Sequence, residues 1–306
     1  MTPEKVTYRH SLSVVINTRN EEKTLSRAIA SVRGLADEII VIDMESSDGT
    51  PETAKKLGAK VFKHTKLNYV EPARNFGISK VTSNWVLILD PDEEIPSTLS
   101  KKIKEVTNTD NADYYRLPRK NIVFGKWLKY SRWWPDYNIR LFRKGFVTWN
   151  EMIHTVPLTQ GQGADIEDKE SLAIVHHHYE TIDQYIDRMN RYTTVQAILK
   201  VKEGYEFSFR DLMSAPVNEF LSRYFAGSGY KDGLHGLAVS LLQAFSELVL
   251  YLKVWQAYKF KEQEITMSEI VSQMATKEKD LHFWQNDALY KETGKLQFRI
   301  KKKLKI

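Results

Sequence analysis

The chain has 306 residues, 42% of them hydrophobic, which is enough for one large domain or two modest domains with a real core. The absence of cysteine excludes disulfides, thiolate metal sites and cysteine nucleophiles, and fits a cytosolic location. A formal net charge of +6 is too small to indicate a nucleic-acid partner. Residues 1–10 are polar and lack the apolar run of a signal peptide.

The first hundred residues alternate apolar strands with amphipathic helices. We expect strands at 12–17, 38–43, 59–62 and 85–89. Asn20 and Thr50 are expected to be the N-caps of two helices, and a third helix is expected around residues 72–80. This alternation predicts an α/β fold with a mostly parallel sheet, whose ligands bind at the carboxyl ends of the strands. We expect this domain to span residues 1–180 and a helical region to span residues 181–306.

A D-x-D sequence, Asp90 and Asp92 around Pro91, follows the apolar strand at 85–89. Two carboxylates in this arrangement can present oxygen ligands to Mg²⁺ or Mn²⁺, which in turn binds a diphosphate. The alternative is that these acids favour the start of a helix near Ser97. Asn17 and Asp43 end other strands and should face the same crevice. No dinucleotide-binding G-x-G-x-x-G follows the first strand, and no P-loop occurs in the sequence.

Residues 113–146 are rich in aromatic side chains, which either stack on sugar faces or belong to the core. Two adjacent tryptophans, Trp133 and Trp134, precede Asp136 in a proline-containing loop. Further along, Glu151 and His154 add an acid and an imidazole. Residues 176–178 are three histidines, which we interpret as structural or as supporting a ligand because nothing completes a dedicated zinc site.

Residues 181–306 are expected to be mainly helical. Thr181 and Gln184 form a capping box, and residues 234–258 form a long, very apolar helix. The apolar stretch within it, 237–252, is shorter than the roughly 20 residues of a membrane span. An in-plane membrane helix, a face for another subunit in a homo-oligomer, and plain core all remain open. The basic tail at 299–305 is either solvated or attracted to an anionic membrane.

Four ordered motifs in residues 11–95 resemble those of the family 2 inverting glycosyltransferases of GT-A fold. The motifs are residues 13–21, residues 41–50, residues 73–77 and residues 89–93. A looser likeness to the branch of bacterial lipopolysaccharide-core glucosyltransferases rests on residues 140–143, 149–154, 178–179 and 232–237. The resemblance implies a nucleotide-diphospho-sugar transferase fold with a Rossmann-like sheet and a helical C-terminal extension.

The resemblance also implies roles for individual residues. The implied donor-binding residues are Thr18, Asn20, Glu21, Asp43, Arg74 and Asp90. Asp92 and His178 are implied as ligands of Mn²⁺ or Mg²⁺. Two positions depart from the pattern, because Met44 stands where a second aspartate is usual and Thr155 stands where the branch often has glutamate.

An inverting transfer needs a base that takes the proton of the acceptor hydroxyl. Asp136 and Glu151 are the candidates, and the alternative for either is an ion pair with Arg140 or Arg143. We expect transfer of a sugar, glucose from UDP-glucose, to a lipid-linked or lipopolysaccharide-type acceptor, by a cytoplasmic protein in peripheral contact with the inner face of the membrane. A protein or peptide acceptor, or a catalytically idle nucleotide-sugar-binding protein, are the alternatives.

Overall fold

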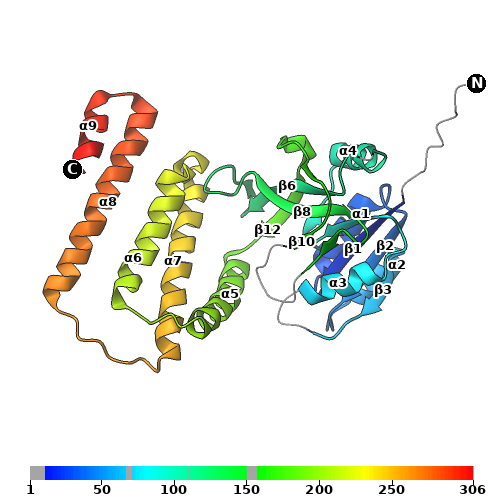
Figure 1. Ribbon diagram of the computed structural model, residues 1–306, viewed down its shortest axis with the longest axis horizontal. Helices are drawn as coiled ribbons and strands as arrows, with labels where there is room; N and C mark the ends of the chain where they lie inside the picture. Colours follow the sequence, from blue (N-terminus) through cyan, green and yellow to red (C-terminus); the bar gives the residue numbers. More distant parts are fainter. Residues whose placement is uncertain (1–10, 67–70, 110, 150–156, 306) are drawn as a thin grey trace, which may run out of the picture. The chain divides into compact units, whose positions relative to one another are not determined.

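The computed structural model describes residues 11–66, 71–109, 111–149 and 157–305 (Figure 1). The chain forms two compact units. The first comprises residues 1–121 and 135–178, and the second comprises residues 122–134 and 179–306. The predicted domains, 1–180 and 181–306, stay a prediction, because the compactness of a unit does not by itself assign it a role.

The first unit is built around a mixed sheet. Its parallel part has the order β3-β2-β1-β4, with β1 at Leu12–Thr18, β2 at Glu38–Asp43, β3 at Lys60–Lys63 and β4 at Trp85–Leu89. The sheet continues as β4-β8-β6-β12-β5, with β5 at Glu93–Glu94, β6 at Tyr114–Val123, β8 at Asp136–Arg143 and β12 at Ile174–Tyr179. Strand β8 is antiparallel to both of its neighbours.

Helices and short strands complete this unit. The helices are α1 (Glu22–Val32), α2 (Thr50–Lys56), α3 (Glu71–Ser79), α4 (Ser97–Thr107) and the short η1 (Glu170–Leu172). The short strands are β9 (Val147–Thr148) paired with β10 (Leu158–Thr159), and β11 (Gly163–Asp165) beside β6. The strands predicted for residues 12–17, 38–43, 59–62 and 85–89 are therefore present, with ends that shift by a residue at most.

Both faces of the sheet are covered. Val14 and Ile16 of β1 pack into the core cluster that also holds the apolar side of α1, while Val15 packs into a second cluster with Ala73 of α3. All five residues of β4 are buried. Strands buried on both faces read as continuous apolar runs rather than as alternating patterns. The apolar runs at 12–16 and 85–89 in the sequence follow from this burial.

The second unit is mainly helical. Its elements are β7 (Lys126–Trp127), α5 (Ile182–Lys202), α6 (Phe209–Phe220), η2 (Leu221–Ala226), η3 (Gly229–Asp232), α7 (Leu234–Ala257), α8 (Met267–Thr293) and α9 (Leu296–Leu304). The predicted capping box starts α5, with Thr181 accepting a hydrogen bond from the backbone N–H of Gln184. The α/β fold with a helical C-terminal region is confirmed.

A sequence stretch matched to the lipopolysaccharide-core branch, residues 232–237, has a structural role in this unit. The buried Asp232 carboxylate accepts hydrogen bonds from the backbone N–H groups of Lys129 and Tyr130 at 2.9–3.3 Å. A Cβ on Gly236 would lie 1.9 Å from the carbonyl oxygen of Gly229. Only glycine therefore allows the first turn of α7 to approach this closely.

Helix α7 is longer than the apolar stretch read from the sequence. It has 24 residues, and its length and apolar composition are sufficient to cross a membrane. The helix predicted at residues 234–258 is therefore present, and its contact with a membrane or with another subunit stays a prediction. Within the second unit, α7 packs against α5 and α6. It is tied to α5 by polar contacts as well, since Gln243 donates to the Tyr185 hydroxyl at 2.9 Å and Lys253 donates to Asn190.

Candidate active site

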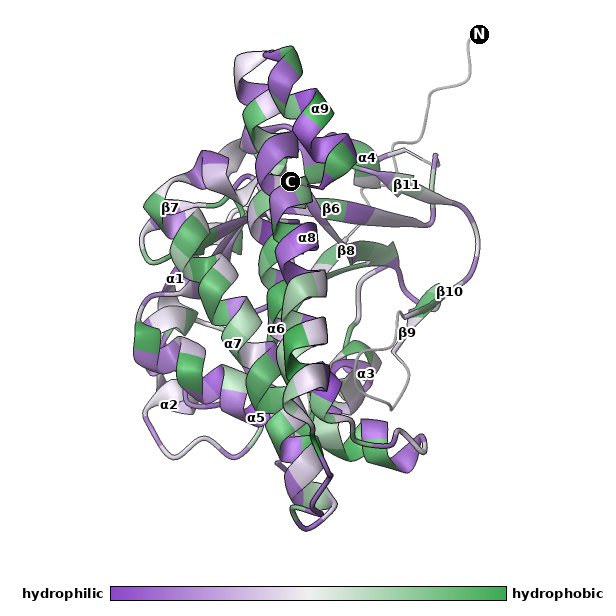
Figure 2. Cartoon of the chain, turned by 90° about the vertical axis from the view of Figure 1, so that its left-hand side faces the viewer, coloured by the Kyte–Doolittle hydropathy of each residue, from purple (hydrophilic) through white to green (hydrophobic). Residues whose placement is uncertain are grey.

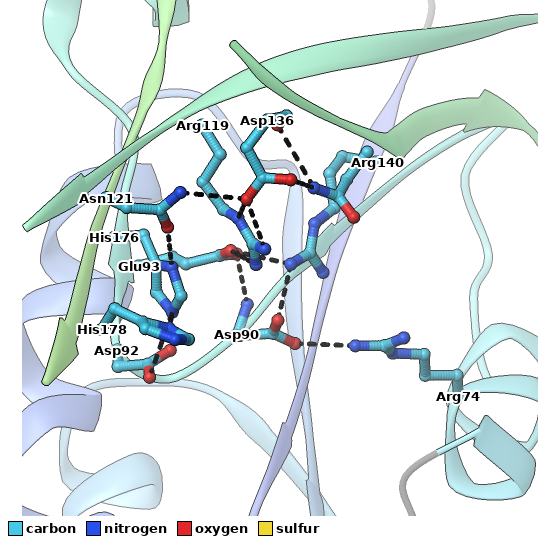
Figure 3. A network of polar contacts seen from close by, with 11 residues as sticks. Arg74, Asp90, Asp92, Glu93, Arg119, Asn121, Asp136, Arg140, His176 and His178 are labelled. Carbon is cyan, nitrogen blue, oxygen red and sulfur yellow. Dashed lines mark hydrogen bonds and ion pairs between the residues drawn. The ribbon is translucent and has the colours of Figure 1, made fainter. Parts of the chain in front are cut away.

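The carboxyl end of β4 carries a network of buried charges (Figure 3). Glu93 is 0% exposed, and its carboxylate accepts from Arg140 Nη2 at 2.7 Å and from the backbone N–H of Asp90 at 2.9 Å. The same Arg140 nitrogen lies 2.5 Å from Asp90 Oδ2. Buried charges persist in proteins when they are paired in this way. The acids after β4 therefore form a charge network rather than a helix cap.

Asp90 has a second cationic partner, Arg74, from α3. Arg74 Nη2 donates to Asp90 Oδ1 at 3.0 Å. Burial alone would raise the pKa of Asp90, but the Arg140 and Arg74 guanidinium groups hold it well below its usual range. A Cβ on Gly77 would lie 2.6 Å from Val15, so glycine is what lets α3 pack on β1 and place Arg74 here. Asp90 thus joins two arginines at one point.

The candidate base, Asp136, belongs to the same network. Asp136 at the start of β8 lies directly across from Arg119 of β6, whose guanidinium donates to Asp136 Oδ2 at 2.7–2.8 Å. Asn121 and Asn138 donate to the same carboxylate at 3.1 Å each. Burial would raise the pKa of Asp136, but Arg119 and these hydrogen bonds lower it below its usual value. The group is therefore an ionised acceptor at neutral pH.

The predicted ion-pair alternative for Asp136 named the wrong arginines. Arg140 pairs with Asp90 and Glu93, and Arg143 lies 3.6 Å from Asp113. The partner of Asp136 is Arg119. Glu151, the second candidate base, and His154 lie outside the described residues. Trp149, the last described residue before them, is held against α3, because the Asn75 side chain makes two hydrogen bonds with its backbone at 2.7 and 2.9 Å.

Asp92 lies beside two histidines of β12. His176 Nε2 is 3.4 Å from Asp92 Oδ2, and His178 Nδ1 is 3.1 Å from His176 Nε2. The other ring nitrogen of His176 lies 2.6 Å from Asn121 Oδ1. Figure 3 shows His176, His178 and Asp92 on one side of the network and Arg74 on the other. As their spacing in a strand predicts, His176 and His178 share a face, whereas His177 pairs with Glu94.

The ends of β1 and β2 bring the remaining predicted donor-binding residues together. Thr18 and Asp43 are neighbours in the sheet register, and both are buried. The Thr18 hydroxyl and both polar atoms of the Asn17 amide are buried without a hydrogen-bond partner among the described residues. Buried polar groups without partners are rare in folded proteins. This end of the sheet therefore offers hydrogen-bonding groups to a ligand.

Asn20 and Glu21 are used by the local fold. Asn20 is not the helix N-cap predicted from the sequence. It has a left-handed backbone, with φ of 56°, and its side-chain oxygen accepts from the backbone N–H of Ser47 at 2.8 Å. Glu21 is the residue that precedes α1, and its carboxylate accepts from the Thr24 hydroxyl at 2.6 Å. Both residues shape the loop next to Thr18, and their contact with a donor stays a prediction.

Comparisons with known proteins decide the family. A family profile described as "Glycosyl transferase family 2" matches residues 13–159. An uncharacterized glycosyltransferase of Rickettsia typhi is 32% identical over 79% of this chain and 86% of its own length. The lipopolysaccharide core biosynthesis glycosyltransferase LpsC of Rhizobium meliloti is 24% identical over 82% of this chain and 94% of that one. The chain belongs to glycosyltransferase family 2.

The chain is also similar to a solved structure. The crystal structure of S. aureus TarS 1–349 in complex with UDP is 14% identical, with a TM-score of 0.45, over 84% of this chain and 94% of that one. Membership of family 2 confirms the predicted GT-A fold and the predicted activity at the level of glycosyl transfer. This glycosyltransferase thus carries its charged network at the sheet edge where the fold predicts the donor.

The side chains near Asp92 fit a divalent cation that is bound partly by the protein and partly by the phosphates of the substrate. Among residues 11–66, 71–109, 111–149 and 157–305, no three histidine, aspartate or glutamate side chains form a ready metal cluster. Mg²⁺ is commonly held by one or two carboxylates together with substrate phosphates, rather than by a cage of protein ligands. Asp92 and His178, on one side of the network, would supply the protein's share of such a site.

Sequence reasoning missed three residues of the glycosyltransferase network. Glu93 and Arg140 both belong to motifs that carry the resemblance, but Glu93 was assigned no role and Arg140 was assigned only an ion pair with Asp136 or Glu151. Arg119 was not considered. The signal for Glu93 was present, because a carboxylate directly after a buried strand must find a cation or metal. The pairing of β8 with β4 and β6, which brings Arg119 and Arg140 close to Glu93, could not be predicted from the order of the strands in the sequence.

Proposed function

We propose that this glycosyltransferase moves glucose from UDP-glucose, with inversion and with Mn²⁺ or Mg²⁺, to a lipid-linked or lipopolysaccharide-type acceptor. One observation carries the proposal: Asp90, at the end of β4, pairs with Arg74 and Arg140, and the adjacent parallel strand β1 ends in buried polar atoms that have no hydrogen-bond partner among the described residues. Since β1 and β4 are adjacent parallel strands, both sets of groups emerge at one edge.

The two strand ends suit the two parts of a nucleotide sugar. Asn17, Thr18 and Asp43 offer hydrogen bonds for a nucleoside. Arg74 and Arg140 offer positive charge for a diphosphate, which guanidinium groups bind well because their donors match phosphate oxygens. The buried Nε atoms of both arginines have no hydrogen-bond partner among the described residues, so each guanidinium has donor capacity left. Asp90 would then hold both arginines in position rather than contact the ribose.

Different residues would perform the two parts of the transfer step, which are proton removal from the acceptor and stabilisation of the leaving diphosphate. Asp136, ionised beside Arg119, would take the proton from the acceptor hydroxyl as its oxygen bonds to the anomeric carbon. The bond from that carbon to the diphosphate breaks in the same displacement, so UDP leaves and the configuration inverts. A divalent cation held by Asp92 and His178 would neutralise charge on the diphosphate. Arg74 and Arg140 would add to that stabilisation.

The acceptor class is supported by one relative, and the location by the exposed apolar side chains of α7. LpsC is named for lipopolysaccharide core biosynthesis, and 82% of this chain aligns with it. We therefore place the acceptor in the lipopolysaccharide or glycolipid class and the protein at the cytoplasmic face of the membrane. The exposed apolar side chains of α7, which include Leu234, Leu241 and Leu252, are consistent with a peripheral contact.

A screen of nucleoside diphosphate sugars tests the proposal. Hydrolysis and thermal stabilisation are measured for each sugar with Mn²⁺ present, and UDP-glucose is expected to give the largest values of both. Stabilisation by UDP, with neither hydrolysis of any donor nor transfer to a lipid, would favour an idle binding protein. Absence of stabilisation by every nucleotide sugar would overturn the donor assignment. Transfer to a peptide rather than a glycolipid would overturn the acceptor assignment.

A further inference from the structure

Helix α9 presents an amphipathic surface in the second unit. Leu296, Ile300 and Leu304 are 65%, 59% and 62% exposed. They follow one another at intervals of four residues, so they lie on one face of the helix. We call these three residues the outer face of α9. Figure 2 shows hydrophobic and hydrophilic residues side by side on this helix.

The opposite side of α9 is fixed to α8, so the exposure of the outer face has a structural cause. Lys302 Nζ lies 2.6 Å from Asp287 Oδ1 and 4.8 Å from the centre of the Phe283 ring. Asp287 is buried and also pairs with Lys291 of α8 at 2.8 Å. A rotation of α9 that buried the outer face would break this ion pair. The helix is therefore held with its apolar residues outward.

Positive charges surround the outer face. Arg299, Lys301 and Lys303 are exposed; on the helical wheel Arg299 and Lys303 lie on one side of the apolar residues and Lys301 lies on the other. Residues 295–305 contain no acidic side chain. An apolar stripe flanked by cations matches the chemistry of an anionic bilayer surface, where acyl chains receive the apolar residues and headgroups attract the cations.

We propose that the outer face of α9 binds the anionic surface of a lipid bilayer, with the helix lying in the plane of the interface. A second copy of this chain fits the surface poorly, because pairing two outer faces would bring their cations together. The proposed glycolipid acceptor gives this contact a purpose, but the physical basis of the contact does not depend on it. The contact would bring the second unit to the membrane without a spanning helix.

Vesicle flotation of the full chain tests the proposal. Vesicles of phosphatidylcholine with phosphatidylglycerol are compared with vesicles of phosphatidylcholine alone, at low and high salt. The wild-type chain is expected to float only with the anionic vesicles, and only at low salt. The charge variant K301Q/K303Q should bind the anionic vesicles about thirtyfold more weakly, since it removes two cations. The apolar variant L296Q/I300Q/L304Q should also stay in the soluble fraction.

Two controls separate the surface from general effects. L158Q changes a leucine of the first unit that is 62% exposed, like Leu304, and K55Q/K56Q removes two exposed lysines of α2. Both controls should float like the wild type. UDP affinity and the urea midpoint should be unchanged in every variant. A variant that no longer floats but still binds UDP has therefore lost the membrane contact of α9 and not the donor site.

Three results would overturn the proposal. In the first, the wild-type chain stays in the soluble fraction with anionic vesicles at low salt. In the second, the α9 variants float like the wild type, which would mean that another surface makes the contact. The third is a wild-type dimer in light scattering that becomes a monomer in L296Q/I300Q/L304Q and ignores vesicles, which would make the outer face a subunit interface.

Discussion

The two units of the molecule place charge and apolar surface in opposite ways. In the first unit, carboxylates and guanidinium groups at the end of β4 are buried and paired with one another, and Glu93 is fully enclosed. In the hairpin of α8 and α9 in the second unit, leucine and isoleucine side chains face outward among exposed cations. Both arrangements are costly unless something compensates for them.

The difference indicates which kind of ligand or surface each unit is suited to bind. A buried network in which the Nε atoms of Arg74 and Arg140 have no hydrogen-bond partner among the described residues suits a small anionic ligand, such as a diphosphate. An exposed apolar stripe flanked by lysine and arginine suits an extended anionic surface. Substitutions that break one arrangement at a time should leave the other unaffected.

The largest effect is expected from Glu93→Gln. The variant removes the buried carboxylate that pairs with Arg140 at 2.7 Å, and leaves that buried cation with Asp90 as its ion-pair partner among the described residues. Breaking a buried ion pair from one side costs about 3–5 kcal/mol, so the free energy of unfolding should fall by that amount. Urea unfolding measures it. Glu105→Gln, which breaks the exposed pair with Lys102, is the control and should change stability by less than about 1 kcal/mol.

The next largest effect is expected on turnover from Asp136→Asn. A base acts in the transition state, so its removal should lower the rate of transfer by about 10²–10⁴-fold and leave UDP affinity unchanged. Asp165→Asn is a matched control, because Asp165 makes a similar but exposed pair with Arg116 at 2.7 Å on the same strand, β6. Near-normal turnover in Asp136→Asn would move the role of base to Glu151, and Glu151→Gln would then be the variant that loses transfer.

A smaller effect, on pH dependence, is expected from Arg119→Gln. Arg119 lowers the pKa of Asp136 in the wild type, so the base stays ionised until the pH falls below the usual range for aspartate. Removing the cation leaves burial, which raises the pKa, less opposed. The acidic limb of the pH–rate profile should therefore move to higher pH. Arg116→Gln should leave the profile in place, and an unmoved limb in both variants would contradict the proposed role of the Arg119–Asp136 pair.

The smallest effect concerns the hairpin. Lys302→Gln removes an ion pair with the buried Asp287 on the inner side of α9, and should cost about 1 kcal/mol of stability. Lys303→Gln changes an exposed residue one position away and should stay within about 0.5 kcal/mol. Urea unfolding compares the two. Equal costs would mean that α9 is not held to α8 by its inner side. Neither variant should alter UDP affinity.

The sequence predicted the parallel strands and their polar ends because those features are local. Each apolar run and the acid that ends it lie within a few residues of one another, as in residues 85–93. The network was missed because β4, β8 and β6 are neighbours in the sheet but not in the chain. Arg119 and Arg140 reach Glu93 from strands 26 and 47 residues further along. Such antiparallel pairing is set by the whole sheet, and no local pattern specifies it.

Asn20, close to the start of α1, also shows that a local pattern does not specify contacts between segments that are distant in the chain. Asn20 has the residue type of an N-cap, yet its backbone is left-handed and its amide serves the loop at Ser47. Asparagine tolerates that conformation as well as it caps helices. Residue type alone could not separate the two roles, and the contact with a segment 27 residues away decided between them.

Calorimetric titration of UDP, with and without Mn²⁺, tests the central claim most directly, because it needs no knowledge of the acceptor. The wild-type chain should bind UDP tightly only with the metal, and Asp92→Ala should lose most of that affinity, since the remaining groups cannot hold the cation against the phosphate oxygens. Asp187→Ala, an exposed aspartate of α5, should behave like the wild type. Equal affinity for UDP with and without Mn²⁺, or full affinity in Asp92→Ala, would contradict the account.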